Sequence, residues 1–349
     1  MPIALFQRGA GTALVAAALF GAGTPIAKLL LADVGPWLLA GLLYLGSGLG
    51  LSIYRALRPN RERTALAAGE GRWLAGAVLF GGVVAPVLMM AGLAGMAASG
   101  ASLLLNAEAV FTALIAWLFF RENAGRRVVV GMVAIVAGAI VLSWPGEARF
   151  GDAWPMLAVL GACLCWGIDN NLTRKVSLAD AAWVASVKGL VAGATNLSLA
   201  LLLGAAWPSW PTVAGAMTLG FFAYGVSLVG FVVALRHLGT ARTAAYFGVA
   251  PFFGAVVAVL LFAEPVTLPL LAAALLMAIG VVLHLTERHA HPHVHEAMAH
   301  AHEHSHDDHH HHAHDGGVAA GVEHSHWHRH EPTEHAHAHV PDAHHRHGH

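Results

Sequence analysis

The feature that most constrains this sequence is a succession of ten apolar runs separated by short breaks. Each run is close to the ~20 residues that a helix needs to cross the hydrocarbon core of a bilayer. Turn and charge signals mark the breaks, as in Arg58-Pro59-Asn60. The runs cover residues 10–32, 36–56, 73–94, 99–120, 127–144, 153–173, 181–204, 212–235, 240–262 and 268–287. The sequence therefore predicts an all-α polytopic membrane protein with ten transmembrane helices.

Composition excludes several other classes of protein. Only 11% of the residues are charged and 57% are hydrophobic, whereas a soluble domain has about 25% charged residues. No cluster of Lys and Arg indicates a nucleic-acid partner. The chain also lacks a phosphate-binding glycine loop, a nucleophile elbow and an H-E-x-x-H motif. The sequence gives no grounds for enzyme activity, and we expect no required cofactor.

The basic residues predict an orientation in the membrane. Before residue 289, the segments on the side of the N-terminus hold 14 Lys and Arg residues. The segments on the other side hold only Lys28 and Arg149. Because Lys and Arg concentrate in cytoplasmic loops, we expect both termini to be cytoplasmic, with the protein in the cell (inner or plasma) membrane.

The two halves of the apolar region resemble each other. Phe20-Gly21 in the first span matches Trp166-Gly167 in the sixth, and at an offset of 142 residues Gly138 lies over Gly280. Each half holds five spans, so the second copy inserts upside down relative to the first, as in many secondary transporters. We expect repeats at residues 1–146 and 147–288, followed by a tail at 289–349.

This arrangement resembles the drug/metabolite transporter superfamily, EamA type. An aromatic-glycine pair opens each half, and a Glu closes the fourth span of each half. The matching residues are Trp166-Gly167, Glu122, Pro251 and Glu264. The sequence departs from the family pattern at Ala109, where the first half often has a proline. The resemblance implies a ten-helix transporter of small organic solutes, usually an exporter.

The most unusual side chain in the spans is that of Glu108, which lies near the middle of the fourth span. A charge at that depth is costly unless it faces the bundle interior or water, and it needs a partner. Lys188 is the cation of similar depth. Either both residues line a central cavity, where they bind substrate or carry a proton, or they form a buried structural pair.

Other polar and aromatic side chains are candidates for the same cavity. Asp169 and Asn170, near the cytoplasmic end of the sixth span, belong either to an inner gate or to a polar helix end. We expect Glu122 and Glu264 to be solvated or to cap helices. The remaining cavity candidates are Asn106, Asn196, Trp166, Tyr224 and Tyr246.

The tail contains 24 of the 26 histidines. It has too few apolar residues to offset the entropy of ordering, so the sequence predicts a disordered cytoplasmic segment. Imidazoles at H-x-H spacing with nearby carboxylates suit Zn, Ni, Co or Cu, and they also titrate near physiological pH. The candidate metal ligands are His291, His293, His295, His300, His302, His304, His306, His309, His310, His311 and His312.

These observations favour a secondary exporter of a small organic metabolite or drug-like solute, working by alternating access with a metal- or pH-responsive tail. The alternative is a divalent-metal (Ni, Co or Zn) exporter that uses the tail as a metal collector. A third hypothesis is a membrane-anchored metal buffer or sensor. The expected partners are a small-molecule solute, the lipid bilayer and a second copy of the chain in a homodimer, with no nucleic acid.

Overall fold

The computed structural model describes residues 3–57, 66, 69–120, 126–143, 153–176, 179–238, 246–286, 289–295, 298–304, 324–330 and 333–339. The first half forms α1 (Ile3–Leu30), α2 (Pro36–Ala56), α3 (Gly71–Ala77), the π-helix η1 (Val78–Val84), α4 (Ala85–Ala94), α5 (Ala98–Leu104), α6 (Ala107–Phe120) and α7 (Arg126–Ser143). The second half forms α8 (Trp154–Thr173), the 3-10 helix η3 (Arg174–Val176), α9 (Ala181–Leu202), α10 (Trp210–Gly220), the π-helix η4 (Phe221–Val226), α11 (Ser227–Leu238), α13 (Ala250–Phe262) and α14 (Leu268–Leu285).

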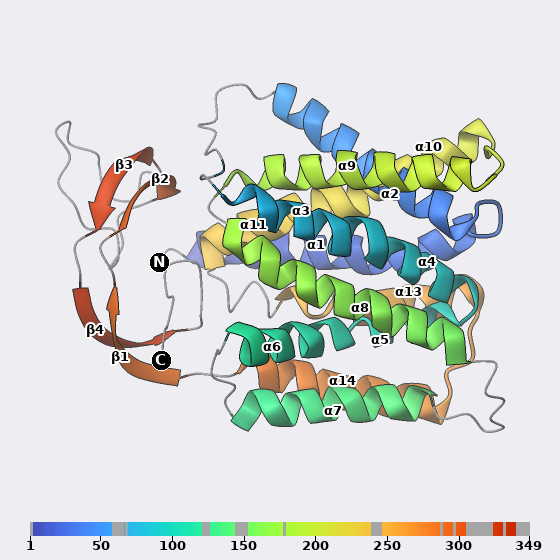
Figure 1. The fold of residues 1–349 in the computed structure, drawn as a ribbon. Helices are drawn as coiled ribbons and strands as arrows, with labels where there is room; N and C mark the ends of the chain where they lie inside the picture. Colours follow the sequence, from blue (N-terminus) through green and yellow to red (C-terminus); the bar gives the residue numbers. More distant parts are fainter. Residues whose placement is uncertain are drawn as a thin grey trace.

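These helices group into ten successive units, counted over the described residues, and the units match the ten apolar runs. The third unit is continuous through α3, η1 and α4, and the eighth through α10, η4 and α11. Within the described ranges, six helices are long and apolar enough to cross a membrane, and two further apolar helices are shorter. The helices lie lengthwise beside one another, and α1 begins at the same end of the bundle at which α14 ends (Figure 1). We call this the tail end and the opposite end the far end.

Large apolar side chains cover much of the outside of the bundle. Leu202, Leu260 and Leu268 each expose more than three quarters of their surface. The interior is equally apolar, with fully buried Leu and Met side chains from α2 and α4. Exposed apolar surface on this scale is expected of a protein whose outer surface faces lipid.

Local sequence signals explain where several helices begin. Asp180 caps α9 by accepting hydrogen bonds from the backbone N–H groups of Ala182 and Trp183. Ser209 caps α10 and Thr267 caps α14 in the same way, each with a Pro in the first turn that follows. A side-chain oxygen at this position replaces one of the missing partners of the first N–H groups of a helix.

The second and the fifth helices of the two repeats pack against their counterparts, α2 with α9 and α7 with α14, and run in opposite directions. In the α7 and α14 pair, a Cβ atom added to Gly138 would lie 3.0 Å from the backbone oxygen of Ala273, and one added to Gly280 would lie 2.7 Å from that of Gly131. In the α2 and α9 pair, a Cβ atom added to Gly189 would lie 2.6 Å from the backbone nitrogen of Gly48. Small residues allow such close contact, which here places equivalent antiparallel helices around the centre of an inverted repeat.

The fourth span of each repeat departs from a regular helix. The predicted run 99–120 is interrupted between α5 and α6, where Leu105 N bonds to Ser102 O at 3.3 Å and Asn106 N to Leu103 O at 3.1 Å. The Asn106 side chain also donates to Leu103 O, at 2.9 Å. In the second repeat, α13 begins after a turn, 143 residues beyond the start of α6. The single unbroken helix that hydropathy indicates is therefore two helices in the fourth span.

The third spans share a feature that hydropathy does not reveal. The π-helices η1 and η4 occupy equivalent positions, since their last residues Val84 and Val226 are 142 apart. π-helical turns are uncommon, and many of those that occur lie at functional sites. Such a turn leaves backbone carbonyl groups available to other donors.

The tail contains four described strands, β1 (His289–His295), β2 (Met298–His304), β3 (His324–His330) and β4 (Thr333–His339). β1 pairs with β4 and β2 with β3, both antiparallel. In the first pair, His289, His291 and His293 lie opposite His339, His337 and His335. The H-x-H alternation of these segments has the period of a β-strand.

Candidate functional site

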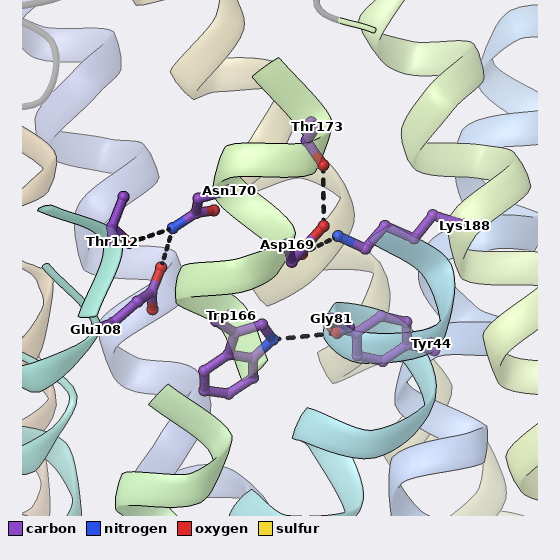
Figure 2. A network of polar contacts seen from close by, with 9 residues as sticks. All are labelled: Tyr44, Gly81, Glu108, Thr112, Trp166, Asp169, Asn170, Thr173 and Lys188. Carbon is purple, nitrogen blue, oxygen red and sulfur yellow. Dashed lines mark hydrogen bonds and ion pairs between the residues drawn. The ribbon is translucent and has the colours of Figure 1, made fainter. Parts of the chain in front are cut away.

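Polar side chains gather on α8 where it passes α6, η1 and α9 (Figure 2). Asn170 points toward α6, whereas Asp169 points toward α9 on the other side of the helix. Trp166, one turn earlier, points toward η1. The sequence-predicted residues on α8 therefore contact three different helices.

Asp169 forms an ion pair with Lys188, through Oδ2 and Nζ. Thr173 donates a second hydrogen bond to Asp169 Oδ1, at 2.9 Å. The side chains of Asp169 and Lys188 are only 6% and 17% exposed. A Cβ atom at Gly81 would overlap the Asp169 carboxylate, so a glycine in η1 makes room for this pair. The sequence left open whether Lys188 pairs with Glu108, and in the structure Lys188 pairs with Asp169.

Glu108 lies in the first turn of α6, directly after the break in the fourth span. Its Oε1 accepts a hydrogen bond from Asn170 Nδ2 at 2.8 Å, and the same amide contacts Thr112 Oγ1 at 3.2 Å. Glu108 is half-buried and Asn170 is exposed. Among the described residues, the structure gives ion pairs to Asp169 and Asp180 but none to Glu108. The carboxylate near the middle of the fourth span therefore has an amide partner and no cation.

The π-helix η1 is held by side chains from three helices. Gly81 O accepts hydrogen bonds from Tyr44 Oη at 2.8 Å and from Trp166 Nε1 at 3.1 Å. Asn196 Nδ2 lies 3.2 Å from both Gly82 O and Val83 O. The buried Asn196 Oδ1 has no partner among the described residues. Asn196 and Trp166, both predicted cavity residues, thus satisfy carbonyl groups that the π-helical turn leaves available.

A row of aromatic side chains continues from this cluster toward α1. Tyr44 and Tyr224 have ring centroids 5.6 Å apart, and Tyr224 meets Phe20 edge-on at 5.8 Å. Phe20 in turn lies 5.4 Å from Phe247. Phe20, Tyr224 and Phe247 are each partly exposed. Tyr224 therefore belongs beside the polar cluster. Neither Phe20 nor Phe247 was predicted to be a cavity residue, although Phe20 stood out in the sequence as part of an aromatic-glycine pair.

Other candidates lie elsewhere. Asn106 is buried at the helix break, and Tyr246 packs with Ala13 and Ala234, apart from the polar cluster. Among the tail histidines, His291, His293 and His295 lie in β1, and His300, His302 and His304 lie in β2. The remaining tail ligands, His306 and His309 to His312, lie outside the described residues. Within the part of the chain that the structure describes, no three His, Cys, Asp or Glu side chains could hold a metal ion together.

A second polar group lies at the far end. Glu264, just after α13, accepts hydrogen bonds from Ala98 N at 2.8 Å and Ser99 N at 3.1 Å. Lys28 Nζ donates to Leu93 O at 3.0 Å and to Met96 O. We call these two interactions the far-end latch. They confirm the expected capping role of Glu264, whereas its counterpart Glu122 lies outside the described residues.

The aromatic-glycine pairs have a clear packing role. A Cβ atom at Gly21 would overlap the backbone oxygen of Ala250 in α13, and one at Gly167 would lie 3.0 Å from Thr112 N in α6. The glycine in the first span of each repeat thus lets it contact the broken fourth span of the other repeat. This contact brings α8 close enough to α6 for Asn170 to reach Glu108.

Comparison with known proteins agrees with this architecture. The model of the EamA-like transporter family matches residues 7–144 and 153–286. An uncharacterized transporter of Methanothermobacter thermautotrophicus (strain ATCC 29096 / DSM 1053 / JCM 10044 / NBRC 100330 / Delta H) is 28% identical over 282 residues, which cover 75% of this chain and 81% of that protein. The uncharacterized transporter YvbV of Bacillus subtilis (strain 168) is 27% identical over 289 residues, covering 78% and 90%. A solved crystal structure with 17% identity covers 78% of this chain and 95% of its own, with a TM-score of 0.59, and shows the same fold.

Proposed function

This chain belongs to the EamA-like transporter family, and from that premise we propose that it exports a small organic metabolite or drug-like solute by alternating access. Members of the family are transporters rather than enzymes, and the chain is a multi-pass membrane protein. The proposal adds the direction, the mechanism and the kind of solute.

One observation carries the proposal: a partly exposed polar site lies at a helix break. Glu108 follows the interruption between α5 and α6, and it shares its hydrogen bond with the exposed Asn170. Secondary transporters bind substrate near the middle of the membrane, where discontinuous helices of the two repeats meet. Because a charged side chain at this depth avoids lipid, the exposed surface of Glu108 and Asn170 is best explained by contact with water.

The far-end latch supports alternating access. Glu264 and Lys28 tie the ends of α13 and α1 to the turn between α4 and α5. A solute that reaches Glu108 from the tail end leaves at the far end only if these hydrogen bonds break. With the distribution of basic residues, which favours cytoplasmic termini in the cell membrane, this path runs outward.

The proposal is tested by comparing the metabolites that deletion cells and overexpressing cells release. We expect overexpression to raise the release of one solute or a small set of related solutes. Glu108→Gln, which is nearly isosteric, should remove most of this release at matched abundance in the membrane. Asp33→Asn makes the same change of charge in the exposed turn after α1 and should leave release unchanged. Depletion of the solute from the medium on overexpression would contradict export.

A second candidate, a divalent-metal exporter that uses the tail as a collector, has one observation in its favour. The register of β1 and β4 sets three pairs of His residues opposite each other, and directly opposed residues of a ladder have neighbouring Cβ atoms. Truncation after Arg288 distinguishes the two functions. If the tail only regulates, truncation abolishes high-capacity Zn or Ni binding and leaves organic flux largely intact. Loss of metal efflux from vesicles with unchanged organic flux would favour the metal exporter.

A further inference from the structure

We propose that the transported solute carries a positively charged amine and that Glu108, with Asn170 beside it, binds this group. The inference rests on the proposed function and names the chemical class of its solute. It follows from the charge balance of the site, its hydrogen-bonding groups, its accessibility and its aromatic neighbours.

The charge balance comes first. The site holds two carboxylates, Glu108 and Asp169, and one cation, Lys188. Lys188 is already paired with Asp169, and Thr173 donates to the same carboxylate. Glu108 is therefore the carboxylate whose charge no described cation neutralises. A charge held within a membrane is stabilised by a partner of opposite sign, and here a bound cation supplies one.

The hydrogen-bonding groups of the site fit an amine. Asn170 uses its amide N–H group on Glu108 Oε1 and Thr112 Oγ1. Among the described residues, no donor contacts Glu108 Oε2 or Asn170 Oδ1, so acceptors remain available at the site. A primary ammonium brings three donors and no acceptor. An anionic group would place its acceptors against these same oxygens.

Accessibility distinguishes this carboxylate from a structural one. Asp169 is almost fully buried with its partners, as expected of an ion pair that holds helices together. Glu108 is half-buried, and Asn170 and Ala109 beside it are exposed. A solute can therefore reach Glu108 without breaking the Asp169–Lys188 pair.

The aromatic neighbours favour an organic cation over a metal ion. Tyr44, which shares Gly81 O with Trp166, stacks near Tyr224, and Phe20 and Phe247 follow, the last three partly exposed. Such rings accommodate the apolar part of an amine and attract a cation through their π faces. A metal ion needs several O, N or S ligands, and the described residues offer no group of three His, Cys, Asp or Glu side chains that could hold one.

The test is equilibrium binding to the purified full-length protein, without transport. We would measure thermal stabilisation at pH 7 by 2-phenylethylamine, by its neutral N-acetyl derivative and by phenylacetate. A ligand that binds only the folded state stabilises it by RT ln(1 + L/Kd), where L is the free ligand concentration, so the rise in melting temperature with ligand concentration reports the affinity. The amine should stabilise the wild-type protein, whereas the neutral and anionic analogues should not. Glu108→Gln should weaken the binding affinity for the amine by about 10- to 100-fold, the usual effect of losing a hydrogen bond between charged groups. Asp33→Asn should not.

Four results would overturn the inference. Equal stabilisation by the amine and its N-acetyl derivative would show that charge is not recognised, and this comparison needs no variant. Unchanged amine affinity in a folded Glu108→Gln protein would place the binding site elsewhere. Stabilisation by NaCl but not by KCl or the amine would assign Glu108 to a sodium ion. If cells release a neutral or anionic solute instead, the inference that the solute is an amine is wrong, whereas the proposed transport function is still supported.

Discussion

The first helix of each repeat makes the same contact in two chemical versions. Asp169 of α8, in the second repeat, packs against Gly81 of η1 in the first repeat. Conversely, Gly23 of α1, in the first repeat, packs against Ala223 of η4 in the second repeat, where a Cβ atom at Gly23 would lie 2.9 Å from Ala223 Cβ. The two contacts share position and geometry, but one places a carboxylate against glycine and the other places two small apolar residues together.

This difference separates what the fold needs from what the site adds. The α1–η4 contact shows that the first helix of one repeat can pack against the third span of the other repeat with small residues alone. The Asp169–Lys188 pair is therefore an addition to the scaffold, and buried ion pairs are seldom more stable than the apolar packing that could replace them. The same holds for Trp166, whose N–H group bonds to Gly81 O, whereas the equivalent Phe20 has no donor.

The largest effect is expected when one partner of the ion pair is removed. Lys188→Met leaves Asp169 charged and enclosed, which should lower the free energy of unfolding by about 3–5 kcal/mol. The double variant Asp169→Asn with Lys188→Met makes α8 more like α1 and should recover most of this loss. Thermal melting of the purified proteins measures both. A double variant less stable than Lys188→Met would mean that the scaffold requires the pair.

A smaller effect is expected at the glycines where the repeats meet. Gly21→Ala forces a methyl group against the backbone oxygen of Ala250, so it should destabilise the protein by about 1–3 kcal/mol. Gly167→Ala should cost less, because its closest contact, with Phe111 Cβ at 2.9 Å, overlaps less than the contact between Gly21 and Ala250 O. Gly11→Ala, on α1 with no atom within 4 Å, is the control and should be neutral or stabilising. Equal melting temperatures for Gly11→Ala and Gly21→Ala would contradict this packing.

The sequence predicted the features that depend on composition along the chain. It missed the features that depend on contacts between residues far apart in the chain. Run length predicted the ten units, because bilayer thickness fixes the length of a span, and the odd number of spans in each half predicted the inversion of the repeats. The break at Leu105–Asn106 and the π-helices are invisible to hydropathy, because they leave the mean hydropathy unchanged. The pairing of Lys188 with Asp169 could have been predicted from the sequence. Asp169 and Lys188 are each about 10 Å of helix from the ends of α8–η3 and α9 that face each other in the chain, so they lie at equal depth in one hairpin.

The far-end latch should have a modest effect on stability that is localised. Glu264→Gln keeps one acceptor for Ala98 and Ser99 but removes the charge, which should cost about 1 kcal/mol. Amide hydrogen exchange should speed up about fivefold across α5. The amides of α14, which the latch does not contact, are the internal control. Faster exchange in both helices would indicate general destabilisation rather than an open far end.

The smallest effect is expected for Tyr44→Phe, which sharpens the comparison at η1. Gly81 O keeps its hydrogen bond from Trp166 Nε1, so losing the Tyr44 hydroxyl should cost only about 0.5 kcal/mol. Trp166→Phe, which gives α8 the aromatic residue of α1, likewise leaves Gly81 O with the Tyr44 donor, although it also removes ring volume. The double variant leaves the carbonyl group buried without a side-chain donor, so its cost should exceed the sum of the single costs by about 1 kcal/mol. Thermal melting of the four proteins gives this coupling energy. Additive costs would show that η1 does not depend on a donor at Gly81, and that both repeats could hold their π-helices by apolar packing alone.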